Sequence, residues 1–157
     1  MRETPLELET EDRVVLHGLI WEPDGAPTAM VQILHGMGEH IGRYARLATE
    51  LCELGYVVLG HDQRGHGRTI REPQDQGHFA DDDGWSKVVS DARAVTNEAR
   101  ERFGDLPIVV FGHSMGSYIL QAYLFQYDDV AGAVLSGSTL NAGLLVKIGR
   151  PAAKFER

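Results

Sequence analysis

The segment from Pro107 to Tyr127 constrains the fold of this chain most, because it reads as a strand, a sharp turn and a helix. Its first residues, Ile108-Val109-Val110-Phe111, form a short β-branched apolar run, which is typical of a buried strand. Gly112-His113-Ser114-Met115-Gly116 follows, and helical spacing begins at Ser117. Small residues on both sides of Ser114 allow the backbones to approach closely. The pattern G-x-S-x-G therefore places Ser114 at a helix N-terminus, where backbone N–H groups favour developing negative charge.

The rest of the chain alternates between short apolar runs and stretches with helical spacing. The predicted buried strands are Ala29 to Leu34, Tyr56 to Leu59, Pro107 to Phe111 and Val130 to Leu135, after an early strand within Arg13 to Trp21. The predicted helices are Tyr44 to Leu54, Trp85 to Phe103 and Ser117 to Tyr127. This order predicts an α/β fold with a mainly parallel sheet and helices on both faces. The polar segment from Gly60 to Gly84 is long for a loop, which is typical of functional or mobile segments.

Charge and composition exclude several classes of protein. The formal net charge is -8, which argues against nucleic-acid binding because phosphate binding needs a basic face. The single cysteine, Cys52, cannot form an intramolecular disulfide, and its helical surroundings predict a buried apolar role. No signal peptide is visible, and no apolar stretch approaches the roughly 20 residues of a transmembrane helix. We therefore expect a cytoplasmic protein.

Two features bear on chemistry. Ser114 is either a nucleophile at a strained elbow or a serine that merely caps the following helix. The glycine-rich segment His35-Gly36-Met37-Gly38-Glu39-His40 directly follows a predicted strand, so it can supply a second N–H for an oxyanion. By position the two donors are the backbone N–H groups of Met37 and Met115. The alternative for this segment is loop packing or a zinc site, but no third histidine follows at metal-ligand spacing. We expect no metal and no cofactor.

These motifs together resemble the α/β-hydrolase superfamily, in particular monoacylglycerol lipases and bacterial lysophospholipases. The resemblance rests on His35 to Tyr44, on Asp62-Gln63-Arg64-Gly65-His66-Gly67, and on Gly112 to Gly116, and it covers Arg13 to Ser138. Ser117 stands where the family usually has another glycine. The implied roles are a nucleophile, Ser114; oxyanion donors, Met37 and Met115; a polar end of the substrate pocket, Glu39, Arg43 and His113; and a structural loop, Asp62, Arg64 and His66.

The resemblance also implies residues that this chain lacks. The family's catalytic order is Ser, then Asp or Glu, then His, yet all seven histidines precede Ser114. His35 is the least unsuitable substitute base. We therefore expect residues 1–138 to form the N-terminal part of an α/β-hydrolase core, truncated at the start of a cap in residues 139–157. We expect the chain alone to be inactive and to self-associate through the edge of its sheet.

The leading hypothesis is a serine hydrolase of small lipid-like carboxylic esters, with transient membrane-surface contact of the full-length form as a secondary hypothesis. A second hypothesis is another serine hydrolase of the same fold, such as a peptidase or thioesterase. A third is a catalytically incomplete fragment or binding protein, which the missing triad members favour.

Overall fold

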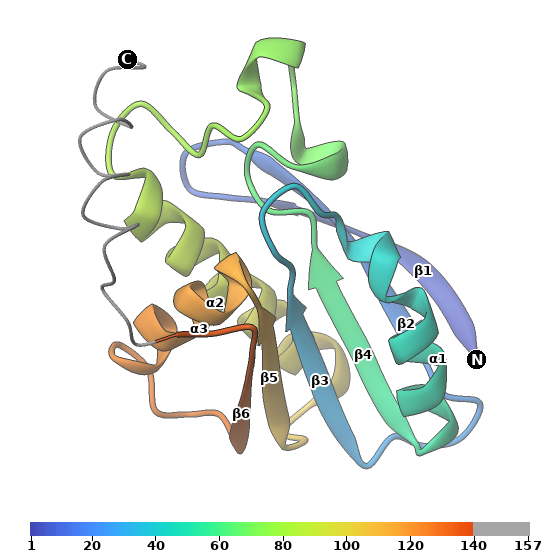
Figure 1. Cartoon of the computed structure of the whole chain (residues 1–157). Helices are drawn as coiled ribbons and strands as arrows, with labels where there is room; N and C mark the ends of the chain where they lie inside the picture. The colour runs from blue at the N-terminus through green and yellow to red at the C-terminus, as the bar shows by residue number, and fades with distance from the viewer. Residues whose placement is uncertain (140–157) are drawn as a thin grey trace.

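The computed structural model describes residues 1–139. These residues form a six-stranded sheet with the strand order β1-β2-β4-β3-β5-β6, packed against helices (Figure 1). The strands are β1 (Arg2–Glu9), β2 (Val15–Glu22), β3 (Ala29–Leu34), β4 (Tyr56–His61), β5 (Ile108–His113) and β6 (Gly132–Ser136). The helices are α1 (Ala45–Glu53), α2 (Gly84–Phe103) and α3 (Met115–Leu124), with 3₁₀ turns η1 (Ile41–Tyr44), η2 (Gly67–Thr69) and η3 (Pro73–Asp75). Strands β4, β3, β5 and β6 are parallel, and β1 and β2 are antiparallel. The predicted fold class and the adjacency of the four parallel strands are confirmed.

Helices cover both faces of this sheet, as predicted (Figure 1). On one face α1 buries Ala48 and Cys52 against Trp21 and Val58, so the apolar role predicted for Cys52 is confirmed. On the other face α2 and α3 cover a larger apolar cluster. Four residues at helical spacing on α2 are buried there: Val88, Ala92, Val95 and Ala99. The helices are thus held on the sheet by the apolar residues that they bury against it.

The register of the central strands brings two loops to one point. Strands β3 and β5 are neighbours, and Leu34 at the end of β3 lies opposite Gly112 in β5. The segments that leave these two strands therefore start side by side at the carboxyl edge of the sheet. Ligand sites of open α/β sheets lie at this edge.

The N-terminal strand β1 was not predicted. The alternation of apolar and polar residues in β1 is weak, because Leu6 and Leu8 stand among the glutamates Glu3, Glu7 and Glu9. Pairing with β2 in an antiparallel hairpin completes the strand and buries Leu6.

The prediction that Val130 to Leu135 is buried is wrong. Strand β6 pairs with β5 on one side, and among residues 1–139 no strand covers its other side. Val134 and Leu135 are consequently 46% and 44% exposed. Self-association through this edge stays a prediction. The cap segment expected in residues 139–157 lies outside the described residues, apart from Thr139. Within the described part, no helix has the length and apolar character needed to span a bilayer.

Candidate active site

Ser114 occupies a strained turn between β5 and α3. Its backbone has φ 49° and ψ −115°, a conformation that residues with side chains rarely adopt. Close packing forces this turn: a Cβ atom on Gly112 would lie 2.5 Å from the Gly116 carbonyl oxygen. A side chain on Gly116 would in turn overlap the carbonyl oxygen of Leu34. The two glycines therefore let strand and helix approach, as the sequence pattern requires.

Hydrogen bonds from two directions hold the Ser114 backbone. Its N–H donates to the Ser136 carbonyl at 2.8 Å, which ties the turn to the end of β6. Its carbonyl accepts the Ser117 N–H at 2.9 Å and the Ser117 hydroxyl at 2.7 Å. The Ser117 side chain thus adds a contact to the turn. The Ser114 side chain makes no cap hydrogen bond, so the helix-capping alternative has no support in this geometry.

The segment after β3 lies directly against Ser114. A Cβ atom on Gly36 would stand 3.2 Å from the Ser114 Cβ. Among residues 1–139, the backbone N–H groups of Met37 and Met115 donate to no protein acceptor. Met37 is 60% exposed, and Met115 is the first residue of α3. Two amide groups without an acceptor among the described residues therefore lie in the segment that contacts Ser114 and directly after Ser114 itself.

Glu39 binds the backbone of the same segment. Its carboxylate accepts the Gly36 N–H at 2.9 Å and the Tyr44 hydroxyl at 2.7 Å, and lies 3.2 Å from an Arg43 nitrogen. Burial raises the pKa of Glu39, but these hydrogen bonds and the charges of Arg43 and His113 leave it below its ordinary value. His113 also contacts the Ser136 hydroxyl through Nδ1 at 3.1 Å. The three predicted substrate-binding residues, Glu39, Arg43 and His113, thus share one electrostatic environment.

His35 is fully buried, and both of its ring nitrogens are occupied. Nδ1 lies 2.8 Å from the Gly36 carbonyl oxygen, and Nε2 accepts the Gln63 N–H at 2.9 Å. Burial lowers the pKa of His35 to about 4, so the ring is neutral near pH 7. In this arrangement His35 is available neither as a base for Ser114 nor as a zinc ligand.

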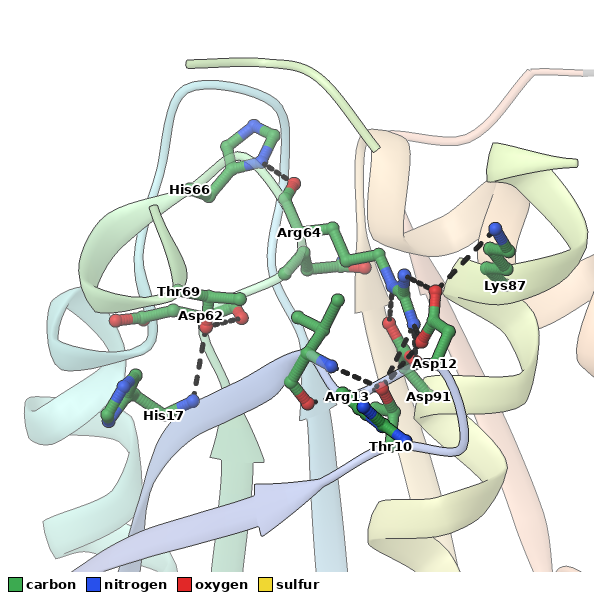
Figure 2. Close-up of polar contacts among 12 residues, drawn as sticks. Thr10, Asp12, Arg13, His17, Asp62, Arg64, His66, Thr69, Lys87 and Asp91 are labelled. Carbon is green, nitrogen blue, oxygen red and sulfur yellow. Dashed lines mark hydrogen bonds and ion pairs between the residues drawn. The ribbon is translucent and has the colours of Figure 1, made fainter. Parts of the chain in front are cut away.

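The loop after β4 is built around a buried carboxylate, Asp62 (Figure 2). Asp62 accepts the backbone N–H groups of Ile41 at 2.7 Å and Arg68 at 2.9 Å. The Thr69 hydroxyl donates to the Asp62 carbonyl at 2.6 Å. His66 donates from Nδ1 toward the Arg64 carbonyl at 2.8 Å. Asp62 and His66 therefore hold the loop itself, in keeping with their implied structural role.

Arg64 joins this loop to two distant segments (Figure 2). Its guanidinium lies 2.6 Å from Asp91 of α2 and 2.6 Å from Asp12 in the β1–β2 turn. The hydrogen bond from Arg64 holds the pKa of Asp12 well below its usual range, whereas burial raises that of Asp91. Asp91 was not predicted. Its signal is a carboxylate three positions after Val88, on the apolar face of a helix.

Comparisons with known proteins agree with this architecture. The sequence model of the serine aminopeptidase S33 family matches residues 25–156. The chain is 37% identical over 124 residues to the monoacylglycerol lipase of Mycolicibacterium smegmatis, covering 78% of this chain and 42% of that protein. It is 34% identical over 136 residues to a monoglyceride lipase homolog of Monkeypox virus, covering 86% of this chain and 47% of that protein.

Among solved structures, a thermostable carboxyl esterase from Bacillus coagulans, in complex with glycerol, superposes with a TM-score of 0.84 at 28% identity. The superposition covers 99% of this chain and 52% of the esterase. The chain thus spans about half the length, or less, of the relatives it matches. The extent of the family match, together with a sheet and elbow of the expected geometry, shows that the chain belongs to the serine aminopeptidase S33 family of α/β-hydrolases.

Proposed function

We propose that this chain carries the nucleophile and oxyanion-binding half of a serine carboxylic-ester hydrolase of the monoacylglycerol lipase and lysophospholipase type. The observation that carries the proposal is the pair of backbone amides, Met37 and Met115, that donate to no acceptor among residues 1–139. One lies in the segment that contacts the strained Ser114, and the other directly follows it. In acyl transfer the serine oxygen attacks the ester carbonyl, and the carbonyl oxygen becomes negatively charged. Amide groups fixed beforehand stabilise that charge without reorganisation.

The reaction also needs a base to remove the Ser114 hydroxyl proton, since a serine hydroxyl is a weak nucleophile near neutral pH. His35 is occupied on both nitrogens, and Nδ1 of His113 contacts Ser136. We propose that the histidine and its orienting carboxylate come from outside these 157 residues. The chain alone then retains only the contribution of the oxyanion site.

The substrate is proposed to be a small lipid-like ester with a polar head group at Glu39, Arg43 and His113. The names of the relatives, monoacylglycerol lipase and carboxyl esterase, support ester chemistry. The family description favours a second candidate, an aminopeptidase. Such an enzyme needs a carboxylate to bind the free amino group of its substrate. Glu39, the carboxylate in the segment beside Ser114, already pairs with Arg43, which favours the ester.

The proposal is tested by labelling the purified chain with a fluorophosphonate and by measuring turnover of a short-chain aryl ester. We expect slow labelling confined to Ser114 and turnover well below about 1 s⁻¹, the low end of ordinary enzyme rates. A monoacylglycerol ether analogue should slow the labelling, and an amino-acid amide should not. Ser114→Ala is the control that removes the labelled atom.

Met37 offers a matched pair of variants. Met37→Pro removes the proposed N–H donor and should slow Ser114 labelling about 10²-fold or more, whereas Met37→Ala keeps the donor and should leave the rate unchanged. Equal rates in the two variants would refute the assignment of Met37. Ester turnover of about 1 s⁻¹ or more would refute the proposal that the base for Ser114 comes from outside these 157 residues.

A further inference from the structure

The imidazole of His35 and the amide side chain of Gln63 join the loops that follow β3 and β4. The Gln63 backbone N–H donates to His35 Nε2 at 2.9 Å. The Gln63 side-chain amide donates to the His35 carbonyl at 3.0 Å. Both residues are fully buried, so water cannot replace either contact.

These contacts define the proton position on the ring. Because Nε2 accepts an N–H, it carries no proton, and the single ring proton of the neutral form resides on Nδ1. Nδ1 then donates to the Gly36 carbonyl at 2.8 Å. In this tautomer, Nε2 of His35 binds the loop after β4, and Nδ1 binds the segment beside Ser114.

The segment held in this way is the one that abuts the nucleophile. Gly36 stands against Ser114, and the next residue, Met37, has no hydrogen-bond acceptor of its own among the described residues. The position of the Met37 amide therefore depends on its neighbours. Glu39 restrains the Gly36 N–H, and His35 restrains the Gly36 carbonyl.

We propose that Gln63 is a positioning residue that acts through His35 to fix the Met37 amide beside Ser114. The role of the Met37 amide as an oxyanion donor rests on the proposed function, whereas the hydrogen bonds that restrain the segment do not. The restraint exists only with the neutral ring protonated on Nδ1. A proton added to Nε2 would face the Gln63 N–H, so that two donors would oppose each other.

The charged and titratable groups around His35 determine how acid acts on this contact. His61 of β4, and His66 and Asp62 of the following loop, are the groups whose charges act on it. The rings of His35 and His66 have centroids 5.3 Å apart, and positive charge on His66 disfavours a second proton on His35. Only Asp62 acts in the opposite sense, and its carboxylate is already bound by Ile41 and Arg68.

Amide hydrogen exchange of the full chain tests the role of Gln63. Gln63→Met preserves side-chain size and removes the amide, and Gln74→Met makes the same change at an exposed site in the same polar segment. The Gly36 and Glu39 amides are the reporters, because both are hydrogen-bonded within the segment. We expect Gln63→Met to speed their exchange about five- to tenfold relative to Val31 and Ile33 in β3, and Gln74→Met to change nothing. Uniform acceleration throughout β3 and the segment, or no change, would overturn the proposal.

Nitrogen NMR of the wild-type His35 ring provides a second test that does not depend on the variant folding. We expect a neutral ring protonated on Nδ1 at pH 7, and selective loss of Gly36 and Glu39 protection as the ring gains its second proton. A ring protonated on Nε2 at pH 7 would overturn the proposal. Neither readout uses ester chemistry, so failed Ser114 labelling would refute the proposed function and leave this restraint intact.

Discussion

The carbonyl oxygen of Leu34, at the end of β3, occupies the space in which a side chain on Gly116 would begin. This contact packs the first turn of α3 against the strand that leads to the Met37 segment. The approach fixes the helix on the sheet and forces the Ser114 turn into its unusual conformation. The geometry of the candidate site therefore depends on the absence of a Cβ atom at Gly116.

Replacing Gly116 tests that dependence. Gly116→Ala should lower the free energy of unfolding by about 3 kcal/mol or more, because a backbone carbonyl cannot yield as a flexible side chain can. Gly25→Ala is the matched control, since no atom of the described part of the chain lies within 4 Å of a Cβ added there. Chemical denaturation should show a change within about 0.5 kcal/mol for the control. Equal stability of the two variants would contradict the packing described.

Ser114 should be strained at a measurable cost. Ser114→Gly removes the side chain that disfavours φ 49° and should stabilise the chain by about 1 kcal/mol, after allowance for the added freedom of the unfolded state. Ser114→Ala retains the strain and should leave stability nearly unchanged. Both remove the proposed nucleophile, so a difference between their unfolding curves isolates the backbone term. A glycine variant no more stable than the alanine variant would count against strain.

Arg64 should matter more for stability than its count of ion pairs suggests. Arg64→Met leaves the Asp91 carboxylate buried without its partner and should cost about 3–5 kcal/mol. Adding Asp91→Leu should restore most of that loss. Arg102→Met removes the partly exposed pair with Glu98 and should cost less than about 1 kcal/mol. Thermal or urea unfolding of the three variants checks this order, and a double variant no better than Arg64→Met would contradict it.

Stability should fall as pH falls from about 6.5 to about 4. Burial lowers the pKa of both His35 and His61 to about 4 in the folded chain, from about 6.5 when unfolded. In that window the unfolded chain binds more protons, so acid favours unfolding, by roughly 3 kcal/mol per histidine at full effect. Among residues 1–139, neither ring nitrogen of His61 has a hydrogen-bond partner. His61→Leu should therefore raise stability at pH 7 by about 1–2 kcal/mol and halve the acid loss between pH 6.5 and 4. An unchanged slope in that variant would refute the assignment.

Strand β6 should mediate association of the purified chain. Val134→Lys places a charge on the exposed strand and should shift sedimentation velocity profiles toward monomer. Phe125→Lys is the control, because Phe125 is 91% exposed but lies at the end of α3. Monomeric wild-type chain at micromolar concentration would contradict the prediction, as would equal effects of the two changes.

The parts of the fold that follow from local pattern could be predicted from the sequence. Short apolar runs that end close to a glycine predicted the strands β3 and β5. The glycines around Ser114 predicted the turn between strand and helix. The hairpin strand β1 could not be found by its apolar content, because its burial depends on pairing with β2. The exposure of β6 could not be predicted for a similar reason, since it depends on which strands lie beside it.

Site residues divide in the same way. Glu39, Arg43 and His113 follow motifs, so they could be proposed as substrate-binding residues, and that role stays a prediction. Their electrostatic coupling could be seen only in the folded structure. The occupied nitrogens of His35 depend on a backbone amide from a different loop, and no local pattern reveals such a contact. Ring tautomers and buried ion pairs are properties of the assembled chain.

The hydrogen bond from the Ser114 N–H to the Ser136 carbonyl has a consequence for synthesis on the ribosome. A nascent chain that ends before β6 contains the serine and its two flanking glycines but lacks the acceptor that holds the turn. The proposed nucleophile is therefore synthesised before all the hydrogen bonds that hold its turn can form. We therefore expect Ser114 to reach its full rate of fluorophosphonate labelling only after residue 136 has left the exit tunnel.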